Sequence, residues 1–143
     1  MRTVRRSARV PYSAAQMFDL VNDVESYPRF LHWCRDARIE RADGDTVEAV
    51  LDIGISGIHK TFKTRNTLER PNKLEIELIS GPFRHLDGVG RFTDQPDGGS
   101  EVSVTLEFEV SHSPLSMIFS AVFEEVARAQ MGAFIKRAKQ IYG

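Results

Sequence analysis

Residues 114–141 predict one long helix, and this helix constrains what the rest of the chain can fold into. Ser113 offers an oxygen that can cap the first turn, and Pro114 sits where its missing N–H is not needed. Apolar side chains then recur at steps of three and four, namely Leu115, Ile118, Phe119, Val122, Phe123, Val126, Ala129, Ala133 and Phe134. At ~1.5 Å per residue the helix is roughly 40 Å long, so the remaining chain must cover an apolar face that crosses a small domain.

From residue 38 to residue 110 the apolar period changes from 3.6 to 2, which predicts about six strands. The turn signals between them are Asp43-Gly44, Pro71-Asn72, Gly81-Pro82 and the run at residues 96–99. The short connections favour antiparallel hairpins in succession. Because one long helix must be covered, the sheet is expected to curl around it.

The N-terminal part supplies one more strand and two short helices. Val4 and Val10 lie in a weak alternating pattern that ends at Pro11. Ser13 with Gln16 forms a capping box for a first helix, and a second short turn runs to Tyr27, before Pro28. Residues 1–143 therefore predict a single α+β domain with about seven strands.

Composition limits the class of protein. The 143 residues are 41% hydrophobic and 27% charged, which suits one domain with a full core. A single cysteine, Cys34, excludes an internal disulfide and a multi-cysteine zinc site, so a reducing, cytoplasmic setting is expected. We find no run of 18 apolar residues and no secretion signal, so any membrane contact is expected to be peripheral.

Candidate catalytic groups do not converge on a reaction. The four histidines are scattered, without the spacing of metal ligands: His32, His59, His85 and His112. Cys34 precedes Arg35, which could lower its thiol pKa, although a buried and inert cysteine is the favoured interpretation. The sequence predicts no enzyme, no metal and no catalytic cofactor.

Two apolar turns and two glycines suggest an incompletely filled interior. The turn at residues 27–34 is unusually aromatic for a loop, and Gly81-Pro82-Phe83 is a second apolar turn. Gly88 and Gly90 share a strand face with Leu86 and Phe92, so they remove side-chain volume beneath the long helix.

Three motifs carry a resemblance that covers essentially the whole chain: SYPRFLHWC at residues 26–34, KTFKTRN at 60–66 and GPFRHL at 81–86. Together they resemble the coenzyme Q-binding START-like family of the polyketide cyclase/dehydrase-like superfamily, whose bacterial members include a ribosome-association toxin. The resemblance implies a helix-grip fold, with a hydrophobic cavity between a curved antiparallel sheet and the C-terminal helix. His32 and Gly90 depart from the family, which often has proline and tryptophan there.

The resemblance implies that the cavity binds ubiquinone, a polyprenyl quinone, as a carrier or chaperone for respiration, in the cytoplasm or peripherally at the inner membrane. Tyr27 or Trp33 at the mouth could donate a hydrogen bond to a quinone carbonyl. The expected ligand-binding residues are Tyr27, Phe30, Leu31, Trp33, Phe62, Leu78, Phe83, Leu86, Phe108, Phe119, Phe123 and Val126.

Two alternatives remain open. As in the toxin, the protein could bind the large ribosomal subunit and block subunit joining, through a basic surface formed by Arg2, Arg5, Arg6, Arg9, Lys60, Lys63 and Arg65. The arginines near the N-terminus could equally protect an edge strand from aggregation. The other alternative, a cyclase or hydrolase, would need an acidic or basic side chain that points into the cavity. The alternation of the strands does not assign any such side chain to the inward face. No DNA partner is expected.

Overall fold

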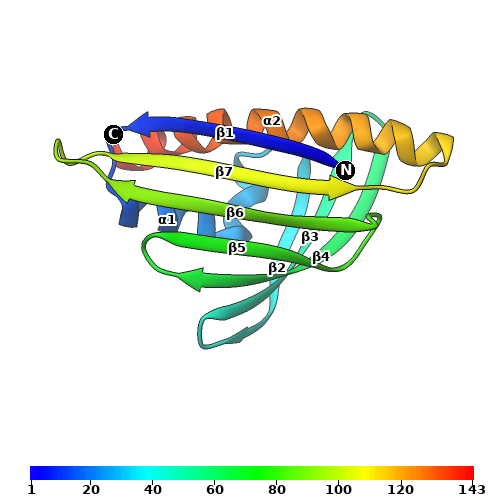
Figure 1. Ribbon diagram of the computed structural model, residues 1–143, viewed down its shortest axis with the longest axis horizontal. Helices are drawn as coiled ribbons and strands as arrows, with labels where there is room; N and C mark the ends of the chain where they lie inside the picture. The colour runs from blue at the N-terminus through cyan, green and yellow to red at the C-terminus, as the bar shows by residue number, and fades with distance from the viewer.

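A seven-stranded antiparallel sheet curves around one long helix in the computed structural model, which describes residues 1–143 (Figure 1). The first elements are strand β1 (Arg2–Val10), helix α1 (Ala14–Asn22) and the 3-10 helix η1 (Val24–Arg29). Six consecutive strands follow, and helix α2 (Pro114–Tyr142) ends the chain. The strands are β2 (Cys34–Asp43), β3 (Thr46–Ile55), β4 (Ile58–Glu69), β5 (Lys73–Ser80), β6 (His85–Asp94) and β7 (Ser100–Glu109). The predicted helix-grip fold is confirmed.

The strand order explains how the sheet reaches both sides of α2. The order is β1-β7-β6-β5-β4-β3-β2, so the N-terminal strand lies beside the last one. Arg2 pairs with Phe108 at one end of β1, and Val10 pairs with Ser100 at the other. The other strands are joined by hairpins, and register shifts in the β2–β3 and β4–β5 pairs bend the sheet locally.

Local capping signals define where both helices begin. Ser13 Oγ accepts the Gln16 N–H at 3.1 Å, and Gln16 Oε1 accepts the Ser13 N–H at 2.9 Å, which completes the predicted capping box. Ser113 Oγ accepts the Ser116 N–H at 3.2 Å at the start of α2. The Tyr142 hydroxyl donates to the Gln16 carbonyl at 2.9 Å, so the end of α2 is fixed against α1.

The predicted apolar face of α2 is partly wrong. Leu115 and Ile118 are 80% and 56% exposed, and Ala129 is also exposed. The first turns of α2 extend past the neighbouring strands in Figure 1, so the buried face begins only at Phe119. Helical periodicity shows which residues share a face, but it does not show where the surface opposite that face ends.

An aromatic cluster fills the space between the sheet and the first buried turns of α2. Its members are Phe62, Phe83, Phe108, Phe119 and Phe123. Ring centroids of neighbouring members lie 4.8 to 6.4 Å apart, mostly edge to face. This aromatic cluster is densely packed core, and the free space lies farther along α2.

Candidate ligand-binding cavity

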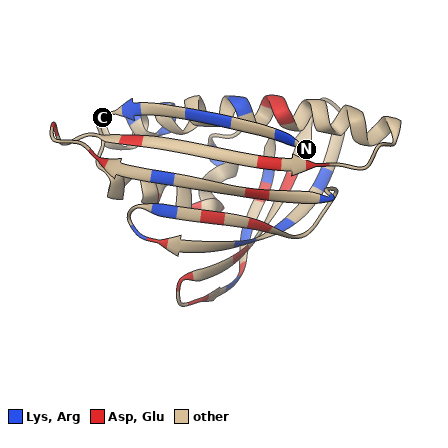
Figure 2. Ribbon diagram, in the orientation of Figure 1, with Lys and Arg blue, Asp and Glu red and all other residues tan.

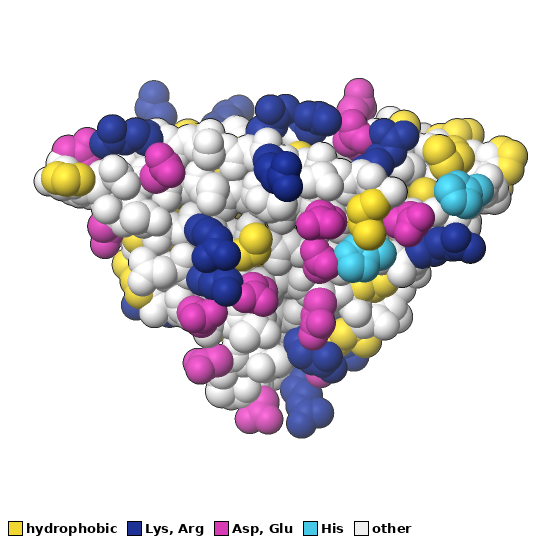
Figure 3. Space-filling model, in the orientation of Figure 1, with side chains coloured by type: hydrophobic (Ala, Val, Ile, Leu, Met, Phe, Trp, Pro, Cys, Tyr) yellow, Lys and Arg dark blue, Asp and Glu magenta, His cyan; other side chains and the backbone are white.

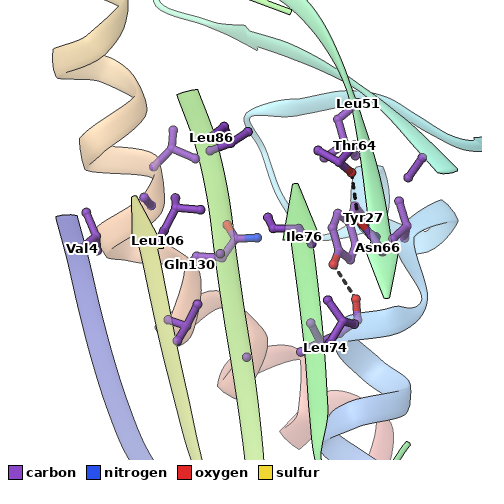
Figure 4. A pocket seen from close by; sticks show the side chains of 18 of the residues that line it. Val4, Tyr27, Leu51, Thr64, Asn66, Leu74, Ile76, Leu86, Leu106 and Gln130 are labelled. Atoms are coloured by element: carbon purple, nitrogen blue, oxygen red, sulfur yellow. Dashed lines mark hydrogen bonds between the residues drawn. The ribbon is translucent and has the colours of Figure 1, made fainter. Parts of the chain in front are cut away.

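A cavity of about 180 Å³ lies between the sheet and the middle of α2 (Figure 4). Of its 23 lining residues, 18 are hydrophobic, and none carries a charge. A dry protein cavity of about 150 Å³ accommodates a benzene ring, so this space suits one substituted ring. The cavity can therefore accept a neutral, largely apolar group of that size.

The two glycines of β6 contribute differently to the cavity floor. A Cβ at Gly88 would lie 3.0 Å from Leu106 and 3.1 Å from Ile76, the residues that flank it on the adjacent strands. A Cβ at Gly90 would meet nothing nearer than Phe92, at 3.5 Å. Both glycines line the cavity, but only Gly90 leaves space that a side chain could fill.

Half of the predicted ligand-binding residues line the cavity, namely Tyr27, Trp33, Phe62, Leu86, Phe123 and Val126. Phe83, Phe108 and Phe119 lie outside it and belong to the aromatic cluster. Phe30 packs against Tyr27 and Phe134. Leu31 is buried core, and Leu78 packs partly buried against that core.

Tyr27 and Trp33 both line the cavity, but each uses its donor in a hydrogen bond within the protein. The Tyr27 hydroxyl donates to the Val21 carbonyl within the protein. The Trp33 indole Nε1 donates to Gln130 Oε1 at 3.2 Å. Sequence position placed both side chains near the cavity, but it could not show that tertiary contacts already use their donors.

The cavity wall also contains three polar side chains that were not predicted from the sequence, Thr64, Asn66 and Gln130. Thr64 and Asn66 follow Phe62 at steps of two, so strand alternation places them on the same inward face. Gln130 follows Phe123 by seven residues on α2, which also places it inward. These three residues could have been found from the sequence as polar residues on an otherwise apolar strand or helix face.

Titratable groups are almost excluded from the cavity. Tyr27 is its one titratable side chain, and burial raises the pKa of its hydroxyl, which keeps it neutral. Cys34 lies outside the wall, and burial raises the pKa of its thiol to about 11, the opposite direction to the lowered pKa considered from the sequence. No group of three or more His, Cys, Asp and Glu side chains is placed to hold a metal.

The predicted basic surface is divided by ion pairs. Glutamates or aspartates pair with four of its members, as Arg2–Glu124, Arg9–Asp97, Lys63–Glu40 and Arg65–Glu48. Arg5, Arg6 and Lys60 make no ion pair. Figure 2 shows Lys and Arg positions on β1 beside Asp and Glu positions on β7, and Figure 3 shows side chains of both signs mixed over the same face of the molecule.

The end of α2 that extends past the sheet carries an exposed apolar patch, made of Leu115, Met117 and Ile118. Hydrophobic side chains gather at this end of the helix in Figure 3. No helix in the structure combines the length and the hydropathy needed to cross a membrane.

Curated relatives match the chain over nearly its whole length. The ribosome association toxin RatA of Escherichia coli K12 is 39% identical over 142 residues, which cover 99% of this chain and 90% of that protein. The mitochondrial coenzyme Q-binding protein COQ10 homolog B of Xenopus laevis is 29% identical over 140 residues, which cover 92% of this chain and 56% of that protein.

A solved structure and a family model agree with these relatives. The Zhui aromatase/cyclase from Streptomyces sp. R1128 superposes with a TM-score of 0.86 at 16% identity, covering 99% of this chain and 96% of that one, which shows a shared fold. The family model described as polyketide cyclase/dehydrase and lipid transport matches residues 10–135. The chain therefore belongs to the polyketide cyclase/dehydrase and lipid transport family, as the START-like resemblance of its motifs predicted.

Proposed function

We propose that this protein binds a polyprenyl quinone, most simply ubiquinone, and acts as a carrier or chaperone that supports respiratory electron transport. The observation that carries the proposal is the ring-sized, uncharged cavity beneath α2. A relative named as a coenzyme Q-binding protein supports the choice of ligand. We propose binding and not catalysis; the lining supports this choice, since it supplies no Asp, Glu, His, Lys, Arg or Cys side chain as acid, base or nucleophile.

The energetics of this proposal require more than the ring alone. Each isoprene unit has five carbons and contributes roughly 4 kcal/mol when buried, at ~0.8 kcal/mol per carbon. Association costs on the order of 4–15 kcal/mol, so a ring with two or three buried units reaches useful affinity. A space of about 180 Å³ holds the ring, and a long tail must extend beyond it.

Mass spectrometry of the protein purified from its own host without detergent tests this function. We expect a near-stoichiometric quinone in native spectra and after organic extraction. Gly90→Leu fills the open space beside Phe92 and should remove the quinone. Gly132→Leu is the matched control, since a Cβ there meets nothing within 4 Å and the residue lies outside the cavity wall. Empty wild-type protein would contradict the proposal.

A relative named as a ribosome association toxin favours a second function, association with the ribosome. We infer, as the resemblance of the motifs implies, that this chain would bind the large subunit and block subunit joining. Arg5 and Arg6 on β1 and Lys60 on β4 are the exposed members of the predicted basic surface that make no ion pair, so they are available for RNA phosphates. Co-sedimentation with purified large subunits should decrease with salt, and Arg5→Glu with Arg6→Glu should abolish it. Arg38→Glu is the control, because Arg38 already pairs with Asp36. Salt-independent or absent co-sedimentation would count against this function.

We further propose that the protein works in the cytoplasm and contacts the inner membrane peripherally. The exposed apolar patch of Leu115, Met117 and Ile118 supports this proposal. A carrier must exchange its ligand with a bilayer, and apolar side chains at the free end of α2 offer a way to touch one.

A further inference from the structure

We propose that the side-chain amides of Asn66 and Gln130 form a headgroup site for a neutral ligand bearing carbonyl oxygens; this inference rests on the proposed binding of a ligand in the cavity. The two amides come from different walls, Asn66 from β4 and Gln130 from α2 (Figure 4). The ligand-binding residues predicted from the sequence are aromatic or aliphatic. None of them offers a free polar group to a ligand.

The orientation of Gln130 follows from its partner. The indole N–H of Trp33 can only donate, so Gln130 must turn its Oε1 toward Trp33, and the two atoms lie 3.2 Å apart. The amide nitrogen of Gln130 then faces away from Trp33 and has no partner in the protein. Figure 4 shows the side chain extending from α2 into the cavity, with its nitrogen directed toward Ile76 of β5.

Asn66 presents a second unpaired amide nitrogen. The Thr64 hydroxyl donates to Asn66 Oδ1 at 2.9 Å, which leaves Asn66 Nδ2 without an acceptor in the protein. Asn66 is only 4% exposed, and it pairs with Ile76 across the β4–β5 ladder. The fully buried side-chain atoms without a hydrogen-bond partner are Ser100 Oγ and Arg137 Nε. The amide nitrogens of Asn66 and Gln130 are therefore not sealed in the core, and a ligand in the cavity can supply their acceptors.

The unpaired amide nitrogens of Asn66 and Gln130 restrict which ligands the site can bind. Both amide oxygens already accept hydrogen bonds, so the site mainly offers N–H donors, which require acceptor oxygens on the ligand. No cation lines the cavity, so a carboxylate or a phosphate would be buried without a counter-charge. A ring with two carbonyl oxygens, as in a benzoquinone, carries the two acceptors that such a pair of donors requires.

Calorimetric titration of the protein with three defined probes, which measures the affinity for each, tests the site. The probes are a benzoquinone with a two-unit isoprenoid tail, the corresponding isoprenoid hydrocarbon, and decanoate. The variants are Asn66→Leu and Gln130→Met, and the control is Gln140→Met, an exposed glutamine on the same helix. Each cavity variant should weaken the quinone about 3- to 10-fold, the range expected for one net hydrogen bond, and change the hydrocarbon less than about 2-fold. Decanoate should bind far more weakly than the quinone.

The outcomes separate this inference from the proposed function. If wild-type protein binds neither the quinone nor the hydrocarbon, the proposed function fails and the headgroup site fails with it. If wild-type protein binds the quinone and both variants keep full affinity, the headgroup site is overturned while the function stands. Equal losses for the quinone and the hydrocarbon would assign the amides a purely structural role. Should Asn66→Leu not fold, Gln130→Met alone decides.

Discussion

Trp33 and Gln130 lie 97 positions apart in the sequence, and the indole N–H of the one donates to the amide oxygen of the other at 3.2 Å. This hydrogen bond joins the aromatic turn after η1 to the middle of α2. It holds Trp33 against the cavity and, at the same time, fixes which end of the Gln130 amide faces inward.

A double-mutant cycle measures this link. Gln130→Leu leaves the 7% exposed Trp33 without an acceptor, and Trp33→Phe removes the donor. Chemical denaturation of the two single variants and the double variant should give a coupling free energy of about 1 kcal/mol, as for one net buried hydrogen bond. Additive effects, within about 0.3–0.5 kcal/mol, would show that the bond contributes nothing to stability.

Gly88→Ala should lower the stability of the protein, whereas Gly90→Ala should not. At Gly88 the new methyl group would crowd Leu106 and Ile76, so we expect a loss of about 1–2 kcal/mol in the free energy of unfolding. At Gly90 the methyl group enters open space, so stability should stay equal or rise by up to about 1 kcal/mol. Urea titration of the two variants checks this, and similar effects at both positions would refute the difference in packing.

Cys34 should be almost inert in the folded protein at neutral pH. Burial raises its thiol pKa to about 11, so below that value the native rate of alkylation should rise about tenfold per pH unit. Because the folded-state pKa is raised, Cys34 contributes stability below the unfolded pKa of about 8.5 and loses that contribution as the pH rises through the folded value.

Iodoacetamide labelling at pH 8, followed by mass spectrometry, measures this difference. The thiolate fraction predicts labelling roughly 200-fold slower in native than in urea-unfolded protein. Cys34 is the single cysteine, so the unfolded protein serves as its own control. Comparable labelling rates would mean that the thiol is accessible and ionised in the fold.

Phe119→Leu and Phe123→Leu should separate core packing from ligand binding. Both side chains belong to the aromatic cluster, so each variant should lose roughly 1 kcal/mol of stability. Only Phe123 also lines the cavity, so Phe123→Leu should alter quinone affinity while Phe119→Leu leaves it unchanged. Calorimetric titration with the short-tailed quinone distinguishes them; equal shifts in affinity would mean that the cavity extends into the aromatic cluster.

The exposed apolar patch should promote contact with lipid. Leu115→Ser with Ile118→Ser removes two side chains that are 80% and 56% exposed, so binding to vesicles that contain anionic lipid should fall several-fold in flotation assays. Ile141→Ser at the other end of α2 is the matched control, since Ile141 is also exposed, at 49%. Equal flotation of all three proteins would remove the patch from the membrane contact.

The sequence predicted the elements well because the signals that define them are local. The capping box of Ser13 and Gln16, the Asp43-Gly44 turn and the alternation from Val102 to Val110 depend on residues a few positions apart. The order of the elements then left few ways to cover a long helix with hairpins, and the motifs identified the family.

The shape of the cavity could not be predicted without the tertiary structure. Gly88 and Gly90 are equivalent in the strand pattern, but only the packing of Ile76 and Leu106 from neighbouring strands shows that one of them is crowded. Likewise, Leu115 and Phe119 follow the same helical period, yet only the position where the sheet ends decides which of them is buried.

The sequence by itself determined the elements, their order and the apolar character of the interior, because local geometry and side-chain periodicity specify these. Only the tertiary structure decided which donors stay free. Trp33 is paired with Gln130 through the juxtaposition of the aromatic turn and α2, which lie 97 positions apart in the sequence. The chemistry of the cavity depends on which of its few polar atoms remain unpaired, and for Trp33 and Gln130 that follows from a contact that no local pattern encodes.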